Sequence, residues 1–488
     1  MNRHLAIPLV LACGLTLASV ASAQTTSPFK PPKEELGTYV VDSGPGLDTG
    51  CTFRSGGPLM IRLNIPKVVN ENMLNTDGTL LKSAAAEMVR SGILSAQATL
   101  SFPVYDIDDK ASTSGFAPEI DRVSFNGKFK KTLEGANNTW TDDAIVVPIE
   151  EIRFGQDNIL QIDIDTGNVG GGEYWCMAVD WLSAEFEVAA PYVLAHGISA
   201  NSDTWEDDSA PGVLNALDKR GVLYNRFSLG TADDGNGSVA SNARELLADI
   251  QDWLVSIRAD RVHVIAHSKG GLDTQAMQAL APEFKLLTLS TLSTPHLGSV
   301  AADLSIIQKE KYDDLVAAGD DPNGYAKTYI DTWTFGQGPQ LPGLRDLTTY
   351  AATTAISTGQ RGNIRRTFTF GADADANSDN QLSTAEASPL FPSAAAYAAK
   401  RAWQVLRDFS SATFTTTTVP GRFWGTRTVL TYTAALAPTQ QANDIVVTLR
   451  SANPVYGVGV GNVKANHSTV KSGSNVDLIL DRTISIKD

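Results

Sequence analysis

The chain has little cysteine, a deficit of basic side chains and, beyond its first residues, no long apolar run. Three cysteines in 488 residues exclude a disulfide-dense scaffold, and no histidine-rich cluster accompanies them to build a zinc site. With 39 Lys and Arg against 54 Asp and Glu, the net charge of −15 argues against nucleic acid and anionic membrane surfaces as partners. The lack of a later apolar run of about 18 residues argues against a transmembrane segment.

The start of the chain, in contrast, is typical of an exported protein. Arg3 supplies a positive charge, an apolar stretch runs from Leu5 to about Val20, and Ala21-Ser22-Ala23 has the small-residue pattern of a cleavage site. Residues 1–23 are therefore predicted to be a signal peptide, which favours secretion, with the periplasm as the other destination. A membrane anchor is the alternative, but the stretch is short for a bilayer and ends in small residues.

Two cysteines remain once a signal peptide is removed with Cys13. Cys51 and Cys176 both lie near or inside strand-like stretches, and two thiols in an oxidising compartment most simply form a disulfide. Two free buried thiols are the alternative. A bridge would close a long loop across the N-terminal region, and such bridges contribute about 2–4 kcal/mol.

Residues 38–189, after a loose leader at 24–37, consist mostly of short strand-like runs separated by glycine and asparagine turns. One helix-like exception covers 82–94. Many short strands with polar turns predict a β-sandwich accessory domain. The expected strands are 60–65, 97–107, 121–127, 144–149, 158–165 and 183–188.

Residues 190–488 have a different hydrophobic pattern, in which apolar strand-like runs alternate with helix-like runs. Ser241 is the expected N-cap of the first long helix. Such alternation predicts βαβ units and a mostly parallel sheet, whose strands are apolar because helices cover both faces. The expected strands are 192–198, 221–229, 261–268 and 285–292, and the expected helices are 241–257 and 271–280.

Ser268 lies between one of these strands and the helix that follows it, in Ala266-His267-Ser268-Lys269-Gly270. Small residues two before and two after the serine allow a tight, strained turn that lifts the hydroxyl clear of the sheet. The start of the next helix offers free N–H groups for an oxyanion. The pattern with its strand and helix predicts that Ser268 is a nucleophile.

A nucleophilic serine needs a base and an acid, and in hydrolases with this turn the chain order is Ser, acid, His. Of the six histidines, only His467 follows Ser268 at long range, and it is the predicted base. Asp444 is the predicted acid, which would orient the imidazole and stabilise its charged form. Asp373, just after a strand-like run, is the alternative acid.

Two backbone N–H groups are expected to form the oxyanion hole. One is that of Lys269, directly after the nucleophile, and the other is that of Ile198, in the loop after the first apolar strand. His196, in the same loop, is expected to shape the turn. The Lys269 side chain either places a cation beside the mouth of the pocket or points to solvent, and the second is favoured.

With these pieces the sequence resembles the α/β-hydrolase superfamily, and secreted bacterial lipases and esterases in particular. The resemblance spans roughly 190–470 and implies an α/β-hydrolase domain with a Ser268–Asp444–His467 triad and with Ile198 and Lys269 as oxyanion donors. Two departures are Ile445 where those lipases usually have Gly, and Lys269 where they often have Met or Gln. The matching pieces are "LAHGI" at 194–198, "AHSKGG" at 266–271, "TPHLGS" at 294–299, "NDIVV" at 443–447 and "NH" at 466–467.

A calcium loop is the one cofactor site that the sequence predicts, and no organic cofactor is expected. Residues 375–386 match the twelve-residue EF-hand pattern, with Asn380 in place of the usual glycine at position six. An acidic turn without metal is the alternative. A bound Ca²⁺ would be structural and would hold the loop beside the active site. The expected ligands are Asp375, Asn377, Asp379, Gln381 and Glu386.

The sequence thus predicts a secreted serine hydrolase that acts on a small-molecule or polymeric ester, such as a lipid or polyester, through an acyl-enzyme. An insertion at about 300–362 is a possible lid over the pocket. A serine amidase or peptidase with the same triad, and a non-catalytic polymer- or glycan-binding protein with a relic hydrolase domain, are the alternatives. The sequence leaves the oligomeric state open.

Overall fold

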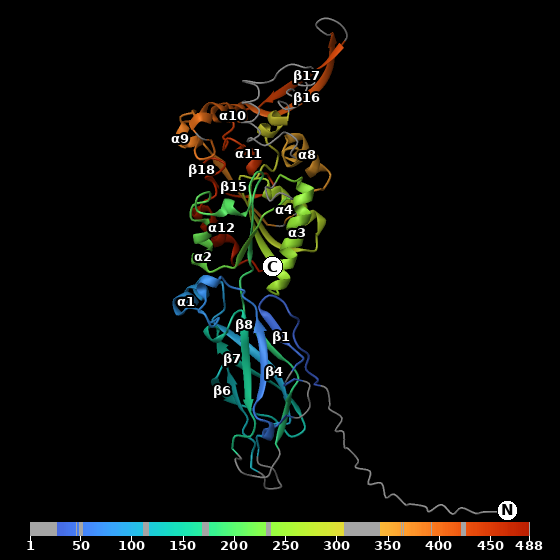
Figure 1. The fold of residues 1–488 in the computed structure, drawn as a ribbon, viewed down its shortest axis with the longest axis vertical. Coiled ribbons are helices and arrows are strands. Elements are labelled where there is room, and N and C mark those ends of the chain that lie inside the picture. Colours follow the sequence, from blue (N-terminus) through green and yellow to red (C-terminus); the bar gives the residue numbers. More distant parts are fainter. Residues whose placement is uncertain are drawn as a thin grey trace, which may run out of the picture.

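The structure is a computed structural model, and it places two regions of different architecture one after the other along the long axis of the molecule (Figure 1). Antiparallel sheets built from the first part of the chain form one end, and a parallel sheet with helices forms the other. The described residues are 27–44, 46–47, 52–110, 117–167, 175–230, 236–306, 342–362, 364, 366–391, 393–420 and 426–487.

The N-terminal region contains two antiparallel sheets. In one, the strand order is β1-β10-β4-β9-β2, with β7 also paired to β4, and in the other it is β3-β8-β5-β6. The bounds are β1 Thr38–Val41, β2 Thr52–Phe53, β3 Leu59–Ile65, β4 Gln97–Tyr105, β5 Arg122–Phe125, β6 Lys128–Thr132, β7 Trp140–Pro148, β8 Gln156–Asp163, β9 Cys176–Val179 and β10 Leu182–Glu185.

Alternation of apolar and polar residues explains these strands. In β3, Leu59, Ile61, Leu63 and Ile65 are buried while the residues between them are exposed, so one face of the sheet joins the core. All six strands expected from the sequence are present, and the expected helix is α1 (Lys82–Arg90). The packing of the two sheets as a β-sandwich stays a prediction.

The predicted disulfide lies in this region. Cys176 is the first residue of β9, and its registered partner on β2 is Phe53, two residues after Cys51. Cys51 itself lies outside the described residues, so its pairing with Cys176 stays a prediction. The signal peptide predicted at 1–23 also lies outside them.

The second region is built on a six-stranded sheet in the order β12-β11-β13-β14-β15-β18, and every neighbouring pair is parallel. The α/β architecture expected from the alternating pattern is therefore confirmed. The strands are β11 Tyr192–Ala195, β12 Tyr224–Phe227, β13 Arg261–His267, β14 Lys285–Leu292, β15 Thr367–Asp373 and β18 Val458–Lys464.

The helices of this region follow the strands, as βαβ units require. The N-cap of helix α3 lies three residues earlier than the sequence suggested, because it is Ser238, whose side chain accepts a hydrogen bond from the N–H of Ser241, the expected cap. Among the described residues of this region, the α-helices are α2 Val213–Arg220, α3 Val239–Ser256, α4 Gly270–Leu280, α7 Pro342–Asp346, α8 Thr349–Ser357, α9 Thr384–Ala387, α10 Ala396–Asp408, α11 Leu449–Ala452 and α12 Gly473–Thr483. The 3₁₀ turns in the described part of the chain are η1 Arg54–Gly56, η2 Glu71–Met73, η3 Ile149–Glu151, η4 Ser202–Trp205 and η5 Ser393–Ala395.

A long excursion interrupts the second region between β15 and Asp444. It contains α9, α10 and the two-stranded ribbon β16 (Phe409–Pro420) and β17 (Thr426–Leu436), which projects from the body in Figure 1. The N–H of Ala374 donates to the carbonyl of Asn443 at 2.9 Å. The chain therefore leaves the sheet at the end of β15 and returns to the same place 70 residues later.

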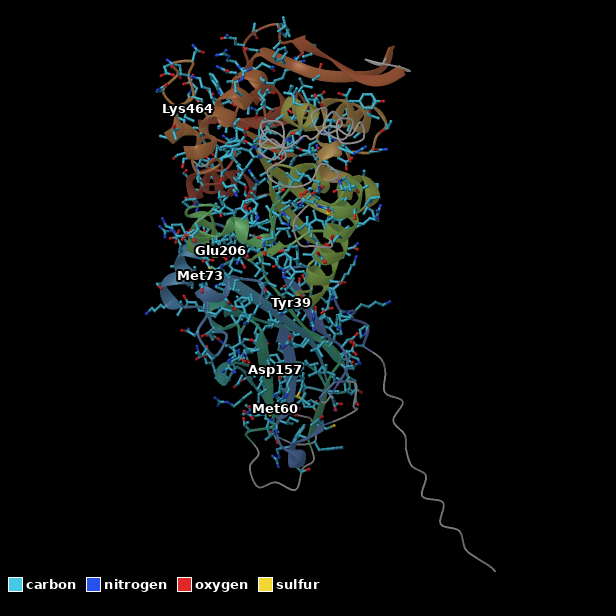
Figure 2. All side chains as sticks on the ribbon, turned by 45° about the horizontal axis from the view of Figure 1, so that its top comes forward. Tyr39, Met60, Met73, Asp157, Glu206 and Lys464 are labelled. Carbon is cyan, nitrogen blue, oxygen red and sulfur yellow. The ribbon has the colours of Figure 1, made fainter. Side chains whose placement is uncertain are left out.

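The two regions share one apolar core, which contains Leu63 and Phe102 of the antiparallel sheets together with Tyr192 of β11 and Trp205. Figure 2 labels Tyr39, Met60 and Asp157 in the first region and Lys464 in the second. The strands of the N-terminal sheets end at Glu185 and those of the parallel sheet begin at Tyr192, but a domain boundary at 189/190 stays a prediction.

Two other expectations concern a membrane-spanning helix and a lid over the pocket. Within the described ranges, none of the helices combines the length and the apolar composition needed to cross a bilayer. The segment 300–362 was the possible lid. Its residues 307–341 lie outside the described part of the chain, so the lid stays a prediction.

Candidate active site

Ser268 occupies a tight turn between β13 and α4. Its φ is +54°, in the left-handed region that costs a non-glycine residue energy, which agrees with the strained turn expected from the sequence. Gly270 has to be small because the chain packs closely here. A Cβ at this position would lie 2.5 Å from the carbonyl oxygen of His196. The pattern around the serine thus reflects contact with the loop after β11.

That loop lies directly against the serine. A Cβ on Gly197 would approach the Cβ of Ser268 to 2.7 Å, so the backbone that leads to Ile198 runs beside the hydroxyl. Neither the Ile198 nor the Lys269 N–H donates a hydrogen bond to another described residue. Both remain available to an oxyanion.

His196 holds the shape of this loop. The N–H of Leu229 donates to its Nε2 at 2.9 Å, which leaves the proton on Nδ1. Nδ1 lies 2.9 Å from the carbonyl oxygen of Gly197 and donates to it. Both ring nitrogens of this buried side chain are occupied, so His196 has a structural part, as the sequence suggested.

His467 lies in the loop that follows β18, and its ring reaches the serine. Its Nε2 is 2.9 Å from the Ser268 Oγ, although 199 residues separate the two in the chain. Both side chains are almost completely buried. An imidazole at this distance can accept the hydroxyl proton as the oxygen attacks an electrophile.

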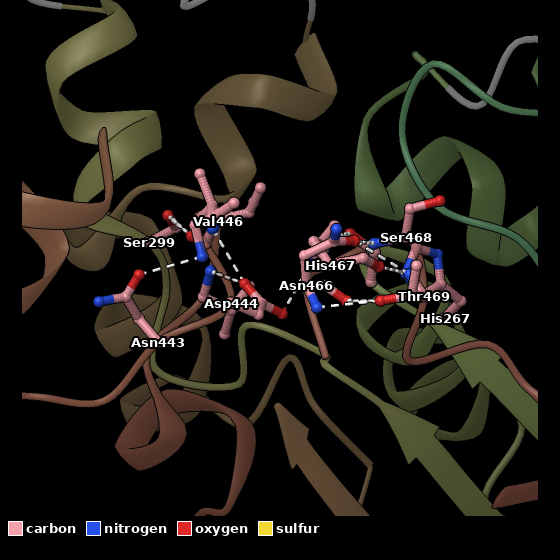
Figure 3. Close-up of polar contacts among 12 residues, drawn as sticks. His267, Ser299, Asn443, Asp444, Val446, Asn466, His467, Ser468 and Thr469 are labelled. Carbon is pink, nitrogen blue, oxygen red and sulfur yellow. Dashed lines mark hydrogen bonds and ion pairs between the residues drawn. The ribbon is translucent and has the colours of Figure 1, made fainter. Parts of the chain in front are cut away.

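Asp444 holds the other side of the imidazole, as Figure 3 shows. Its Oδ2 accepts from His467 Nδ1 at 2.8 Å, while Oδ1 accepts from the N–H groups of Val446 and Val447 at 2.9 and 2.6 Å. The carboxylate is fully buried. With Nδ1 protonated against Asp444, Nε2 is left as the acceptor for the serine proton.

Asp373, the alternative acid, points elsewhere. It ends β15, and its Oδ2 accepts from the Lys464 Nζ at 2.7 Å. Because the excursion returns to the end of β15, Asp373 and Asp444 lie near the same strand end, which explains why both fitted the sequence pattern.

His267 is a part of the site that the sequence did not reveal. Its Nε2 donates to the carbonyl oxygen of His467 at 2.7 Å, and the two ring centroids are 4.8 Å apart. Burial, followed by the charge of Lys471, holds the pKa of His267 well below its usual range. A neutral His267 therefore tethers the loop of His467 without competing for the serine proton.

Two further side chains secure the same loop. Asn466 donates through Nδ2 to the carbonyls of Glu386 and Ser388 at 3.0 and 2.7 Å. Lys471 is buried, donates to the carbonyl and hydroxyl of Thr204, and has a pKa that burial lowers to about 8. The loop of His467 is thus held on the side of α9 and on the side of η4.

The expectation that the Lys269 side chain points to solvent is wrong. Lys269 is fully buried, and its Nζ lies 2.8 Å from the Asp273 Oδ1, one helical turn along α4. Burial raises the pKa of Asp273 to about 6, against the opposing effect of Lys269. The i,i+4 spacing of the two residues is the sequence signal that would have indicated this pair.

The predicted calcium loop adopts a compact turn. Asp375 accepts from the N–H groups of Asp379 and Asn380, and φ is +61° at both Ser378 and Asn380. The Glu386 carboxylate caps α9 by accepting from the Ser383 N–H. Among the described residues, no group of three or more His, Cys, Asp or Glu side chains is arranged to hold a metal. Ca²⁺ binding here stays a prediction.

The sequence of this chain is similar to those of known hydrolases. The model of the alpha/beta hydrolase family matches residues 192–455. Triacylglycerol lipases of Pseudarthrobacter phenanthrenivorans and Burkholderia plantarii are each 30% identical over 185 residues, 36% of this chain, and the match covers 53% and 48% of their lengths. The chain spans about half the length of these curated relatives. A solved structure of the mature form of a Bacillus licheniformis lipase is similar with a TM-score of 0.40 and 17% identity, over 61% of this chain and 93% of that one.

Proposed function

This chain belongs to the alpha/beta hydrolase family, and from that premise we propose that it is a lipase- or esterase-type enzyme that cleaves carboxylic esters with Ser268, His467 and Asp444. The observation that supports the proposal most strongly is the pair of contacts on His467, at 2.9 Å to the serine oxygen and at 2.8 Å to the aspartate. A hydroxyl hydrogen-bonded to an imidazole, which is in turn hydrogen-bonded to a buried carboxylate, is an arrangement suited to acyl transfer.

In the first half of the proposed reaction, the Ser268 Oγ attacks the ester carbonyl while His467 Nε2 takes its proton. Asp444 stabilises the imidazolium that forms, because its Oδ2 already accepts from Nδ1. The negative charge on the carbonyl oxygen is held by the N–H groups of Ile198 and Lys269. One such donor is generally worth about 10²–10³ in kcat.

In the second half, His467 passes its proton to the leaving alkoxide and the acyl group remains on Ser268. Water then enters, His467 accepts one of its protons, and the ester bond to the serine is broken by the same steps in reverse. Ser268, Asp444 and His467 are restored.

The substrate class is proposed from the relatives. Two of them are triacylglycerol lipases by name, and a lipid or polyester with carboxylic ester bonds is therefore the proposed substrate. Secretion forms part of the proposal because residues 1–23 have the charge, apolar stretch and small-residue end of a signal peptide. A Cys51–Cys176 disulfide would fit that destination.

A panel of nitrophenyl esters of increasing acyl length tests the proposed activity. We expect turnover at about 1–10³ s⁻¹ with the preferred ester, the usual range for enzymes. Each ester should be paired with the anilide of the same acyl group. Because the leaving group is then the main difference, an anilide turned over as well as its ester would identify an amidase instead. Absence of turnover together with no labelling of Ser268 by a fluorophosphonate would contradict an enzymatic function.

We also propose that Ca²⁺ binds the loop 375–386, with Asp375, Asn377, Asp379, Gln381 and Glu386 as the ligands. The compact turn supports this, and oxygen donors at this spacing suit a hard cation. The Lys464 Nζ donates to the Asp375 carbonyl and the Ser378 hydroxyl at 2.8 and 2.9 Å. Since Lys464 ends β18 and Asn466 is tied to the carbonyl of Glu386, the loop braces the segment that carries His467.

Chelation is therefore expected to lower both the melting temperature and kcat, and Asp379→Asn should have the same effect with calcium present. A cation at 100 times its Kd stabilises the folded state by about 2.7 kcal/mol. The melting temperature should be measured with and without EGTA, together with ester turnover. Glu283→Gln, which removes an exposed charge far from the loop in sequence, is the control and should respond to EGTA as the wild type does. An Asp379→Asn protein with the wild-type response to EGTA would remove the loop as a calcium site.

A further inference from the structure

Ser268 shares its contact with His467 with a second residue of the same turn. His267, directly before the serine, donates through Nε2 to the backbone carbonyl oxygen of His467 at 2.7 Å (Figure 3). The Ser268 Oγ lies 2.9 Å from the ring of the same histidine. Two consecutive residues thus hold His467 at two points, the serine at the side chain and His267 at the backbone.

The turn that carries both residues is fixed to the central sheet. His267 is the last residue of β13 and is registered with Leu292 of β14. The N–H of Ser268 donates to the carbonyl of Leu292 at 3.0 Å. Because groups on strands are held more precisely than groups on loops, His267 presents its N–H from a fixed position.

His467, in contrast, lies in a loop, and its backbone is held from two sides. Its N–H donates to the Asp444 carbonyl at 3.0 Å, and its carbonyl accepts from His267. The Asp444 contact joins the loop to the segment after the excursion. The His267 contact joins it to the strand that leads to the nucleophile, so it bears directly on the distance between serine and imidazole.

His267 provides this contact without adding a charge to the site. Its side chain is buried, and this burial, followed by the charge of Lys471, holds the pKa of His267 well below its usual range. His467 and His196 also face it and act in the same direction. A neutral imidazole keeps one N–H, and the His467 carbonyl places it on Nε2. No positive charge on His267 therefore opposes the imidazolium that forms on His467.

We propose that His267 is a positioning residue for ester cleavage, because its bond to the His467 carbonyl sets the distance between the Ser268 Oγ and the imidazole. This inference rests on the proposed function. Proton transfer needs heavy atoms about 2.6–3.2 Å apart, and a misplacement of about 1 Å can cost about 10²-fold in rate. Loss of the donor should therefore lower kcat and leave KM unchanged.

His267→Phe removes the donor and keeps an aromatic ring beside His467, whose centroid is 4.8 Å away in the wild type. We expect kcat for the preferred ester to fall about 10²-fold, with KM unchanged and with slower labelling of Ser268 by a fluorophosphonate. In His267→Gln, the amide nitrogen takes the place of Nε2 and should restore most of kcat.

His263→Phe is the matched control, because His263 is a second buried histidine of β13. Its Nδ1 lies 2.9 Å from the Thr288 Oγ1, and its ring stacks on Tyr192. The substitution should lower the melting temperature and leave kcat at the wild-type value. Measuring both quantities in each variant separates a loss of stability from a loss of positioning.

Wild-type kcat in a folded His267→Phe protein would overturn the inference, and so would a His267→Gln protein as slow as His267→Phe. If His267→Phe does not fold, His267→Met replaces it, because methionine is close to glutamine in size and lacks the donor. Either result in an active wild type leaves the proposed function standing. A wild type that neither cleaves esters nor reacts with the fluorophosphonate would overturn the proposed function and this inference with it.

Discussion

Ser268→Ala is expected to reduce kcat for the preferred ester by about 10⁶-fold, which is the loss that removal of a nucleophile causes in a serine hydrolase. The substitution deletes the one oxygen that lies 2.9 Å from His467 Nε2. Alanine meets the same left-handed backbone as serine and is smaller, so the fold should persist. Turnover is measured beside circular dichroism and the melting temperature of the variant.

Ser290→Ala is the matched control for this experiment. Ser290 is a buried serine in the neighbouring strand β14, and its hydroxyl has no hydrogen-bond partner among the described residues, so its loss should change kcat little. A fluorophosphonate should label the wild type and Ser290→Ala but not Ser268→Ala. Wild-type turnover in a folded Ser268→Ala protein would eliminate Ser268 as the nucleophile.

Asp444→Asn is expected to lower kcat by about 10⁴-fold while the fold is kept. The asparagine oxygen can still accept from the N–H groups of Val446 and Val447, which leaves the amide NH₂ facing His467. The NH₂ would donate to Nδ1 and force the imidazole proton onto Nε2. A protonated Nε2 cannot take the proton of Ser268, and kcat for the ester panel reports the loss.

Asp373→Asn distinguishes the two candidate acids. Asp373 is comparable in type and lies at the same strand end, but its carboxylate pairs with Lys464. We expect its replacement to cost at most about 1 kcal/mol, the usual value of a partly exposed ion pair, with kcat within tenfold of the wild type. A large loss in Asp373→Asn and a small one in Asp444→Asn would transfer the role of the acid to Asp373.

Much of the fold was predictable because its strands and helices carry strong local patterns. The apolar runs of β11, β13 and β14 and the alternation in β3 indicate buried and half-buried strands without any long-range information. Short strands such as β2, with two residues, have no such pattern and form because a partner strand supplies their hydrogen bonds. The run at 427–436 is strand-like in sequence, but only the structure shows that it belongs to the ribbon and not to the central sheet.

The candidate site was predictable where chemistry restricts the residue type. Ser268 has a local turn pattern, and His467 follows from chain order among very few histidines. The contact of His267 with the carbonyl of His467 joins residues 200 apart and involves a backbone atom, so no sequence pattern reports it.

The excursion after β15 has a consequence for comparing this protein with others. Its two ends meet where the Ala374 N–H donates to the Asn443 carbonyl, so Asp444 lies at the end of β15 although the whole excursion separates the two in the chain. Counting residues from the nucleophile would misplace the acid in a chain with a shorter excursion. The equivalent aspartate is better located by the strand terminus that it adjoins.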